Sequence, residues 1–481
     1  MVKESLFRRY YNCKIDQKNR IILKSSPPCY FWGMNSNSLQ LKTSYRDIMG
    51  LAFPITASLL IPQINFITNL VFLGSLGEEV LAMAGITGVY YLIFSVIGHG
   101  LNSGLQTLIS RRAGENNPKA IGTLFSQGIL IAIAISVISI LFTLLVSPYI
   151  FRALMVDEKL VQMTNHFLSV RIWGLPLLLL YQLRNALLVG INQSKFLMVG
   201  TAVETLFNIV FDYGLIYGKL NLPEMGYIGA AYASIIAEFA GLVVIAFIVQ
   251  LPSVKNTIRL QLTAKPDFEL IWSILTVSFP LIVQFVISVV AWEFFYISME
   301  HYGERELAIS SLVRTLFGFF GSFTWAFASA TTTMVSNVMG QGKKEEVIPV
   351  TMRIMKLSVG FACLWAILLL SVPKIFFTVF SNDVGLLTDS VPIIRVVALA
   401  LVVMSISCIW LNAVVGTGNT RITLLAELIS ISLYVGYVFL VTRIFHLSLS
   451  AAWMSEWVYW STLFFISFLY MKKGQWALKT I

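Results

Sequence analysis

The stretch Gly77-Glu78-Glu79-Val80-Leu81-Ala82 returns as Gly303-Glu304-Arg305-Glu306-Leu307-Ala308 in the second half of the chain. Other pairs keep the same offset: Phe53-Pro54 with Phe279-Pro280, Ser110 and Gly114 with Ser336 and Gly340, and Val189-Gly190 with Val415-Gly416. Ala230-Ala231 returns as Ala451-Ala452 at a slightly shorter offset. An offset shared along about 140 residues predicts that the chain contains one structural unit twice.

The composition places this duplicated unit in a membrane. The chain has 481 residues, of which 57% are hydrophobic and only 12% charged. Soluble domains contain about 25% charged residues, so a soluble multidomain protein is excluded. We attribute the net charge of +10 to membrane orientation and not to nucleic-acid binding. The four cysteines lack metal-ligand spacing and predict neither a disulfide framework nor a metal site.

Apolar runs long enough to cross a bilayer occur twelve times. Lys and Arg number 22 in the N-terminus, the alternate loops and the C-terminus, against 6 in the opposite loops. An even number of spans places both termini on the same side, and by the positive-inside rule this side is the cytoplasm. The expected location is the cytoplasmic (inner) membrane. The expected spans are 48–73, 81–108, 120–147, 162–188, 196–217, 227–250, 271–299, 306–335, 349–373, 389–414, 422–443 and 449–470.

The fold class that follows is an all-α membrane protein with 12 transmembrane helices in two parallel six-helix repeats. Parallel repeats form two lobes around a cleft, and rocking of the lobes gives alternating access for a small-molecule substrate. The expected divisions are a cytoplasmic N-terminal segment (1–45), an N-terminal lobe (46–255), a cytoplasmic linker (256–270), a C-terminal lobe (271–470) and a cytoplasmic tail (471–481).

Residues 1–33 carry seven basic residues and no apolar core of signal-peptide length. Two interpretations stay open. The segment is a juxtamembrane arm that binds membrane lipids, or the mature chain begins at Met34.

The repeated residues also carry a family resemblance. The chain resembles the multidrug and toxic compound extrusion (MATE) family over residues 45–470. The motifs that carry the resemblance are Asn69-Leu70-Val71-Phe72-Leu73-Gly74-Ser75-Leu76-Gly77, Gly104-Leu105-Gln106, Ser110-Arg111-Arg112-Ala113-Gly114, Gly229-Ala230-Ala231-Tyr232-Ala233-Ser234, Ser329-Ala330-Thr331, and Ser336-Asn337-Val338-Met339-Gly340-Gln341-Gly342.

The resemblance implies a secondary antiporter that exports amphipathic or cationic small molecules in exchange for H+ or Na+, and not an enzyme. We expect a monomer without a cofactor. One alternative is a flippase for lipid-linked precursors, which needs several Arg or Lys in its cavity. A non-transporting scaffold is another. The major facilitator architecture is disfavoured because its basic signature between spans two and three is absent.

Glu204, Asn208 and Asp212 are spaced i, i+4 and i+8 on the fifth span and so form one polar stripe. The resemblance implies that Asn208 and Asp212 belong to a cation site with Ser234 and a first-span residue. That residue is usually Asp in the family and is Asn69 here. The loss of one carboxylate weakens Na+ binding more than H+ binding, so we expect H+ coupling through Asp212 with Glu204 and Glu238 in reserve.

The second lobe gives a less specific pattern. Another branch of the family has Glu where Ser288 stands, and the nearest acid is Glu293, for which we expect a structural ion pair with Arg314. We expect Glu427 and Glu456 to stabilise the helix bundle, facing Arg395.

The candidate polar groups of the substrate cavity lie on the first and seventh spans. These spans are symmetry mates at the expected interface between the lobes. The candidates are Gln63, Asn65 and Gln284.

Overall fold

The computed structural model describes residues 39–255, 258, 265–373 and 384–478, and within them the chain is helical without strands. Residues 1–33 and most of the expected linker 256–270 lie outside this described part. The helices of the N-terminal lobe are α2 (Tyr45–Gly74), α3 (Glu78–Gly114), α4 (Pro118–Leu145), α5 (Ser147–Leu154), α6 (Glu158–Arg171), α7 (Leu175–Gly190), α8 (Lys195–Tyr217) and α9 (Tyr227–Gln250).

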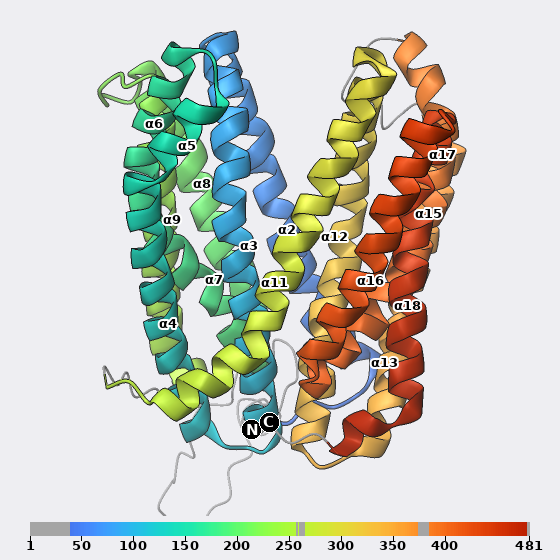
Figure 1. Cartoon of the computed structure of the whole chain (residues 1–481). Coiled ribbons are helices and arrows are strands. Elements are labelled where there is room, and N and C mark those ends of the chain that lie inside the picture. Colours follow the sequence, from blue (N-terminus) through green and yellow to red (C-terminus); the bar gives the residue numbers. More distant parts are fainter. Residues whose placement is uncertain (1–38, 256–257, 259–264, 374–383, 479–481) are drawn as a thin grey trace, which may run out of the picture. The chain divides into compact units, whose positions relative to one another are not determined.

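The short helix α10 (Pro252–Lys255) follows this lobe. The C-terminal lobe repeats the pattern of long antiparallel helices (Figure 1). Its helices are α11 (Phe268–Met299), α12 (Glu304–Gly340), α13 (Val347–Ser371), α15 (Val384–Thr417), α16 (Thr420–Phe439), α17 (Leu449–Trp453) and α18 (Ser455–Lys473).

Local signals in the sequence fix where the helices begin. The α2 N-cap Ser44 accepts from the backbone N–H of Asp47, and Asp157 caps α6 by accepting from two backbone N–H groups. Helix α4 starts at Pro118 behind Asn117, whose side chain accepts from the N–H of Ala120. Each cap satisfies N–H groups that the first helical turn leaves without a partner.

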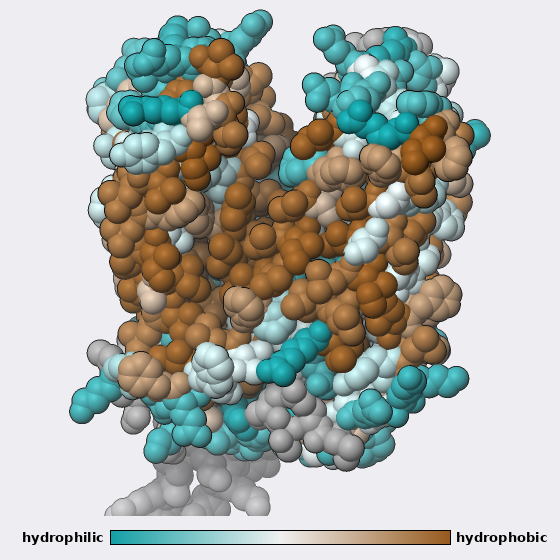
Figure 2. All heavy atoms as spheres, in the orientation of Figure 1, coloured by the Kyte–Doolittle hydropathy of each residue, from teal (hydrophilic) through white to brown (hydrophobic). Residues whose placement is uncertain are grey.

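The prediction of an all-helical membrane protein is confirmed. Among the described residues, eleven helical segments are long and apolar enough to cross a bilayer. The twelfth expected span, 449–470, corresponds to α17 and α18. Helix α18 packs against α15 and α16, but it contains Glu456 near its start and Lys472 and Lys473 at its end. In Figure 2 an apolar band lies between two hydrophilic ends, as a membrane-spanning protein requires.

One expected span is interrupted. Instead of a continuous helix over 162–188, α6 and α7 are joined by a 3-10 turn at Ile172–Gly174. The cause is Pro176 in the first turn of α7, because proline has no N–H to continue the helical hydrogen bonds. The short helix α5 was not expected from the sequence.

The first helix of each repeat contacts both lobes. Helix α2 packs on α8 and α3 of its own lobe and on α12 of the other, and α11 packs on α16 and α12 of its own lobe and on α3 and α4 of the other. Pro54 and Pro62 lie inside α2, and Pro280 lies inside α11. Proline inside a helix removes a backbone hydrogen bond and favours a bend at these positions.

The lobes meet at one end, where α3 and α12 cross. Ser336 donates to the carbonyl of Thr107 at 2.7 Å, and Gln106 donates to the hydroxyl of Thr333 at 2.8 Å. The start of the described chain lies at this end, because Asn337 accepts from the N–H of Leu41 at 2.9 Å. At the opposite end the surface is hollowed between the lobes (Figure 2).

Candidate functional site

Three of the expected cation-site residues lie together in the N-terminal lobe, on three different helices. Asn69 on α2 donates from Nδ2 to Oδ1 of Asn208 on α8 at 3.4 Å. Asn208 in turn donates from Nδ2 to the hydroxyl of Ser234 on α9 at 3.5 Å. These two hydrogen bonds connect α2, α8 and α9 through side chains that also offer oxygen atoms.

Asp212 lies one helical turn beyond Asn208 and is fully buried. Neither of its carboxyl oxygens has a hydrogen-bond partner among the described residues. The same holds for the side-chain oxygens of Asn69 and Asn65. Buried polar atoms are almost always paired, and oxygens without donors are suited to bind a proton or a hard cation.

A buried ion pair lies beside this cluster. Arg171, the last residue of α6, pairs with Glu238 on α9 at 2.5 Å, and its guanidinium lies 4.0 Å from the ring centre of Tyr91. Arg171 also interacts electrostatically with Asp212. Arg171 is nevertheless paired with Glu238 and forms no hydrogen bond with the Asp212 carboxyl group.

Glu204 has a different environment from the other residues of the polar stripe. It lies close to the Tyr181 hydroxyl and the Arg184 guanidinium of α7. Arg184 is buried, donates to the hydroxyl of Thr201 at 2.7 Å and stacks 3.2 Å from the ring centre of Tyr181. Glu204 thus belongs to an Arg184 network one turn away from Asn208.

Sequence reasoning did not assign Arg171 to the site. The available signal was its position directly before Ile172-Trp173-Gly174-Leu175-Pro176, where a helix break is expected. An ionisable residue at a helix break inside a membrane is a candidate functional residue.

The remaining candidates lie in the C-terminal lobe and along α2. Glu293 and Arg314 form an ion pair at 3.5 Å, with Arg314 packed against the ring of Trp292. Gln284 is buried inside the lobe, where its Nε2 donates to Glu427 at 3.3 Å, while Gln63 and Asn65 are half-buried. Their role in a substrate cavity stays a prediction.

The expectation that Glu427 and Glu456 face Arg395 is wrong, because their hydrogen-bond partners among the described residues are all uncharged. Glu427 is hydrogen-bonded to Gln284, Ser288 and Tyr459, and Glu456 to tryptophan and tyrosine side chains, whereas Arg395 is exposed on α15.

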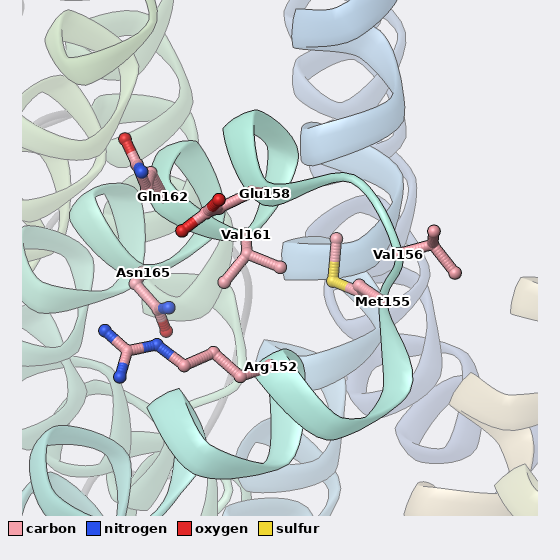
Figure 3. Close-up of a pocket in the computed structure, with 7 residues that line it drawn as sticks. All are labelled: Arg152, Met155, Val156, Glu158, Val161, Gln162 and Asn165. Carbon is pink, nitrogen blue, oxygen red and sulfur yellow. The ribbon is translucent and has the colours of Figure 1, made fainter.

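A separate pocket of about 480 Å³ lies between α5 and α6 (Figure 3). Its lining contains one basic and one acidic side chain, Arg152 and Glu158, and the residues of the cation cluster do not contribute to it. The seven lining residues are Arg152, Met155, Val156, Glu158, Val161, Gln162 and Asn165.

Comparison with known families supports the duplication. The sequence model of the MatE family matches residues 54–214 and again residues 280–440. The first match begins at Pro54 and the second at Pro280, which are the two prolines of one repeated motif, so the family model and the motifs give the same offset.

Relatives cover nearly the whole chain. The Probable multidrug resistance protein NorM of Thermotoga maritima is 25% identical over 447 residues, which are 91% of this chain and 94% of that protein. The Multidrug resistance protein MdtK of Yersinia pseudotuberculosis is 23% identical over 382 residues, which are 78% of this chain and 81% of that protein.

Solved structures share the fold. A MOP superfamily transporter from Pyrococcus furiosus aligns with a TM-score of 0.83 at 17% identity, covering 93% of this chain and 99% of that one. A multidrug resistance MATE family transporter in an outward-facing conformation aligns with a TM-score of 0.82 at 18% identity, covering 91% of this chain and 96% of that one.

Proposed function

Because the chain belongs to the MatE family of multidrug and toxic compound extrusion transporters, we propose that it exports amphipathic or cationic small molecules by secondary active antiport. The names of its relatives describe multidrug resistance proteins, which supports this class of substrate. The two lobes, closed at one end and separated by a hollow at the other, suit a carrier that opens to one side at a time.

One observation supports the coupling site above all others: Asp212 is fully buried and both of its carboxyl oxygens lack a partner among the described residues. An ionised carboxylate left in this way is very costly, since burial of an unpaired charge is strongly unfavourable. A bound proton or cation removes this cost. The free energy of binding a proton or cation at Asp212 therefore depends on whether water reaches the site. Ion coupling requires such a dependence.

We assign the proton as the coupling ion. The cluster offers a single carboxylate, because Asn69, Asn208 and Ser234 are neutral and the charge of Arg171 is balanced by Glu238. Na+ keeps its charge in the site and depends on the number of carboxylate ligands, of which the cluster has one. A proton neutralises the carboxylate and leaves no net charge on it.

The sidedness of the cycle follows from the charge distribution of the loops. With the termini cytoplasmic, the end where α3 and α12 cross is the cytoplasmic end, and the hollow opens to the outside of the inner membrane. Proton binding to Asp212 from the outside would then accompany release of the exported compound, and proton release to the cytoplasm would reset the carrier.

The flippase alternative requires basic side chains that are free to hold a diphosphate. Arg171 and Arg314 are engaged in ion pairs with Glu238 and Glu293. These pairs favour drug antiport over lipid-precursor transport.

The test is efflux of a fluorescent organic cation from proteoliposomes under separate pH and Na+ gradients. We expect efflux driven by the pH gradient, and we expect Asp212→Asn to abolish this dependence. Asp389→Asn serves as the matched control, because Asp389 is half exposed in an ion pair with Arg305 and surface pairs contribute little to stability. pH-driven efflux that persists in Asp212→Asn would exclude Asp212 as the coupling residue.

A further inference from the structure

A second buried carboxyl group lies in the C-terminal lobe, at the junction of three helices. Glu427 on α16 is fully buried. Its Oε1 lies 2.6 Å from the hydroxyl of Ser288 on α11 and 2.5 Å from that of Tyr459 on α18. The other titratable neighbour is Cys408 on α15, and the described residues place no charged side chain among the partners of Glu427.

The hydroxyl of Ser288 has one hydrogen and two acceptors within reach. It lies 2.8 Å from the backbone carbonyl oxygen of Gln284 and 2.6 Å from Glu427. If its hydrogen goes to the carbonyl, the short contact to Glu427 requires a proton on the carboxyl group. If its hydrogen goes to Glu427, the carboxylate is ionised. Rotation of one hydroxyl group therefore provides a complete set of hydrogen bonds for either state of Glu427.

The amide of Gln284 is a second neighbour that can either donate a hydrogen bond to Glu427 or accept one from it. Gln284 is 6% exposed, its Nε2 donates to Oε2 of Glu427 at 3.3 Å, and its own Oε1 has no partner among the described side chains. A half-turn of the amide exchanges the two atoms, so that Oε1 can accept a hydrogen bond from a protonated Glu427. The unpartnered oxygen thus points to a ligand that supplies a hydrogen.

The distances show that Glu427 is held by direct hydrogen bonds. Oxygen atoms 2.5 to 2.6 Å apart are typical of a short hydrogen bond that involves a carboxylate.

The nearby Glu456 shows the contrasting case. Its partners are the indole N–H groups of Trp460 at 2.9 Å and Trp292 at 3.5 Å, together with the hydroxyl of Tyr434 at 3.5 Å. Indole N–H groups donate and cannot accept. Two of the three partners of Glu456 therefore cannot accept a hydrogen from it, whereas Ser288 and Gln284 can both accept one from Glu427.

We propose that Glu427 is a second proton-binding site of the transporter, served by Ser288, Gln284 and Tyr459. The site deepens the antiport proposed above and rests on it for its place in the transport cycle. It does not depend on Asp212, which lies in the other lobe.

The two proton sites lie at different depths. Glu427 is 7 residues beyond Thr420, the start of α16, or roughly 10 Å along the axis. Asp212 is 17 residues beyond Lys195, the start of α8, or roughly 26 Å. The two helices are related by the repeat and start at the same end. Glu427 therefore lies in the half of the membrane near the closed end, and Asp212 in the half near the hollow.

The test is infrared difference spectroscopy on the full-length transporter in lipid vesicles, comparing acidic with alkaline buffer. We expect Glu427→Gln to remove part of the protonated-carboxyl C=O band and to lower proton uptake by one per transporter. Ser432→Ala, a change of an exposed hydroxyl on the same helix, should leave both the band and the proton count unchanged. An intact band in a folded Glu427→Gln variant would overturn the proposal.

Glu427→Asp covers the case in which the Gln variant does not fold, because it keeps a carboxyl group on a shorter side chain. We expect its band to persist at a shifted frequency, and an unshifted band would overturn the proposal.

Asp212→Asn distinguishes this proposal from the proposed function. If Asp212 is not a proton site, its variant keeps the full band while Glu427→Gln still loses its share.

Discussion

The closed end of the transporter depends on two glycines that the repeat places in equivalent positions. A Cβ atom added at Gly114 on α3 would lie 2.0 Å from the backbone oxygen of Asn337, and one added at Gly340 on α12 would lie 2.2 Å from that of Arg111. Both obstacles are backbone atoms, which cannot rotate away. We therefore predict that Gly114→Ala and Gly340→Ala separate the lobes at this end.

The size of the effect can be worked out from these distances. Real Cβ contacts stay above 3.0 Å, so the helices must move apart by about 1 Å. Overpacking of this kind costs about 1–3 kcal/mol, and only the conformation in which α3 and α12 touch bears the cost. At about 1.4 kcal/mol per factor of ten, the population open at this end rises about 5- to 150-fold relative to the closed one.

The assay is a distance measurement between spin labels at positions 119 and 345, in a chain without its native cysteines. Lys119 and Glu345 are both exposed near this end, one on each lobe. We expect the long-distance population to grow in Gly114→Ala and in Gly340→Ala. The double variant should add less than the sum of the single effects, because one separation of the helices relieves both contacts.

The matched controls are Gly88→Ala on α3 and Gly318→Ala on α12. A Cβ atom at either position meets nothing within 4 Å, so both variants should leave the distance distribution unchanged. The reasoning is refuted if Gly114→Ala gives the same distances as Gly88→Ala. It is equally refuted if all four variants shift alike, since the cause would then be helix propensity and not the contact.

Three further predictions concern charged and polar side chains. Glu238→Gln leaves Arg171 buried without its partner and should lower the free energy of unfolding by about 3–5 kcal/mol, measured by thermal unfolding in detergent; a double variant with Arg171→Met should recover part of the loss, and no recovery would contradict the pairing. Asn69→Asp adds a carboxylate to the cluster and should make efflux depend on Na+, whereas efflux that stays independent of Na+ would show that the charge count does not select the ion. Arg111→Ala removes donors to the carbonyls of Gly416 and Thr417 and should cost about 1.5–3 kcal/mol of stability, while an unchanged unfolding temperature would mean that water replaces them.

Much of the architecture could be predicted because it depends on patterns within the chain. Hydropathy located helices to within a few residues, as for the expected span 227–250 and α9 (Tyr227–Gln250). The repeat predicted two lobes, and the family model matches each of them. Helical periodicity also placed Asn208 and Asp212 on one face of α8.

The partners of each side chain could not be predicted in this way. Hydropathy indicates that a residue lies in the membrane but not which way its helix is rotated or which helix it faces. Ser288 and Glu427 are 139 residues apart in the sequence, and nothing local connects them. The same limit hid the pairing of Arg171 with Glu238, which are 67 residues apart.

The duplication is kept where the lobes meet and lost where protons are proposed to bind. At the crossing both helices need a residue without a side chain, and the repeat supplies a glycine to each. At the offset that relates Gly114 to Gly340, the counterpart of Asp212 is the apolar Val438, and the counterpart of Glu427 is Thr201. Two carboxyl groups at equivalent depth would gain and lose contact with the same side of the membrane together as the lobes rock. Carboxyl groups in opposite halves meet water in different conformations, because Asp212 lies near the hollow and Glu427 lies near the end that is closed here. In the proposed antiport cycle, the divergence of the two repeats thus assigns the two proton sites to different steps.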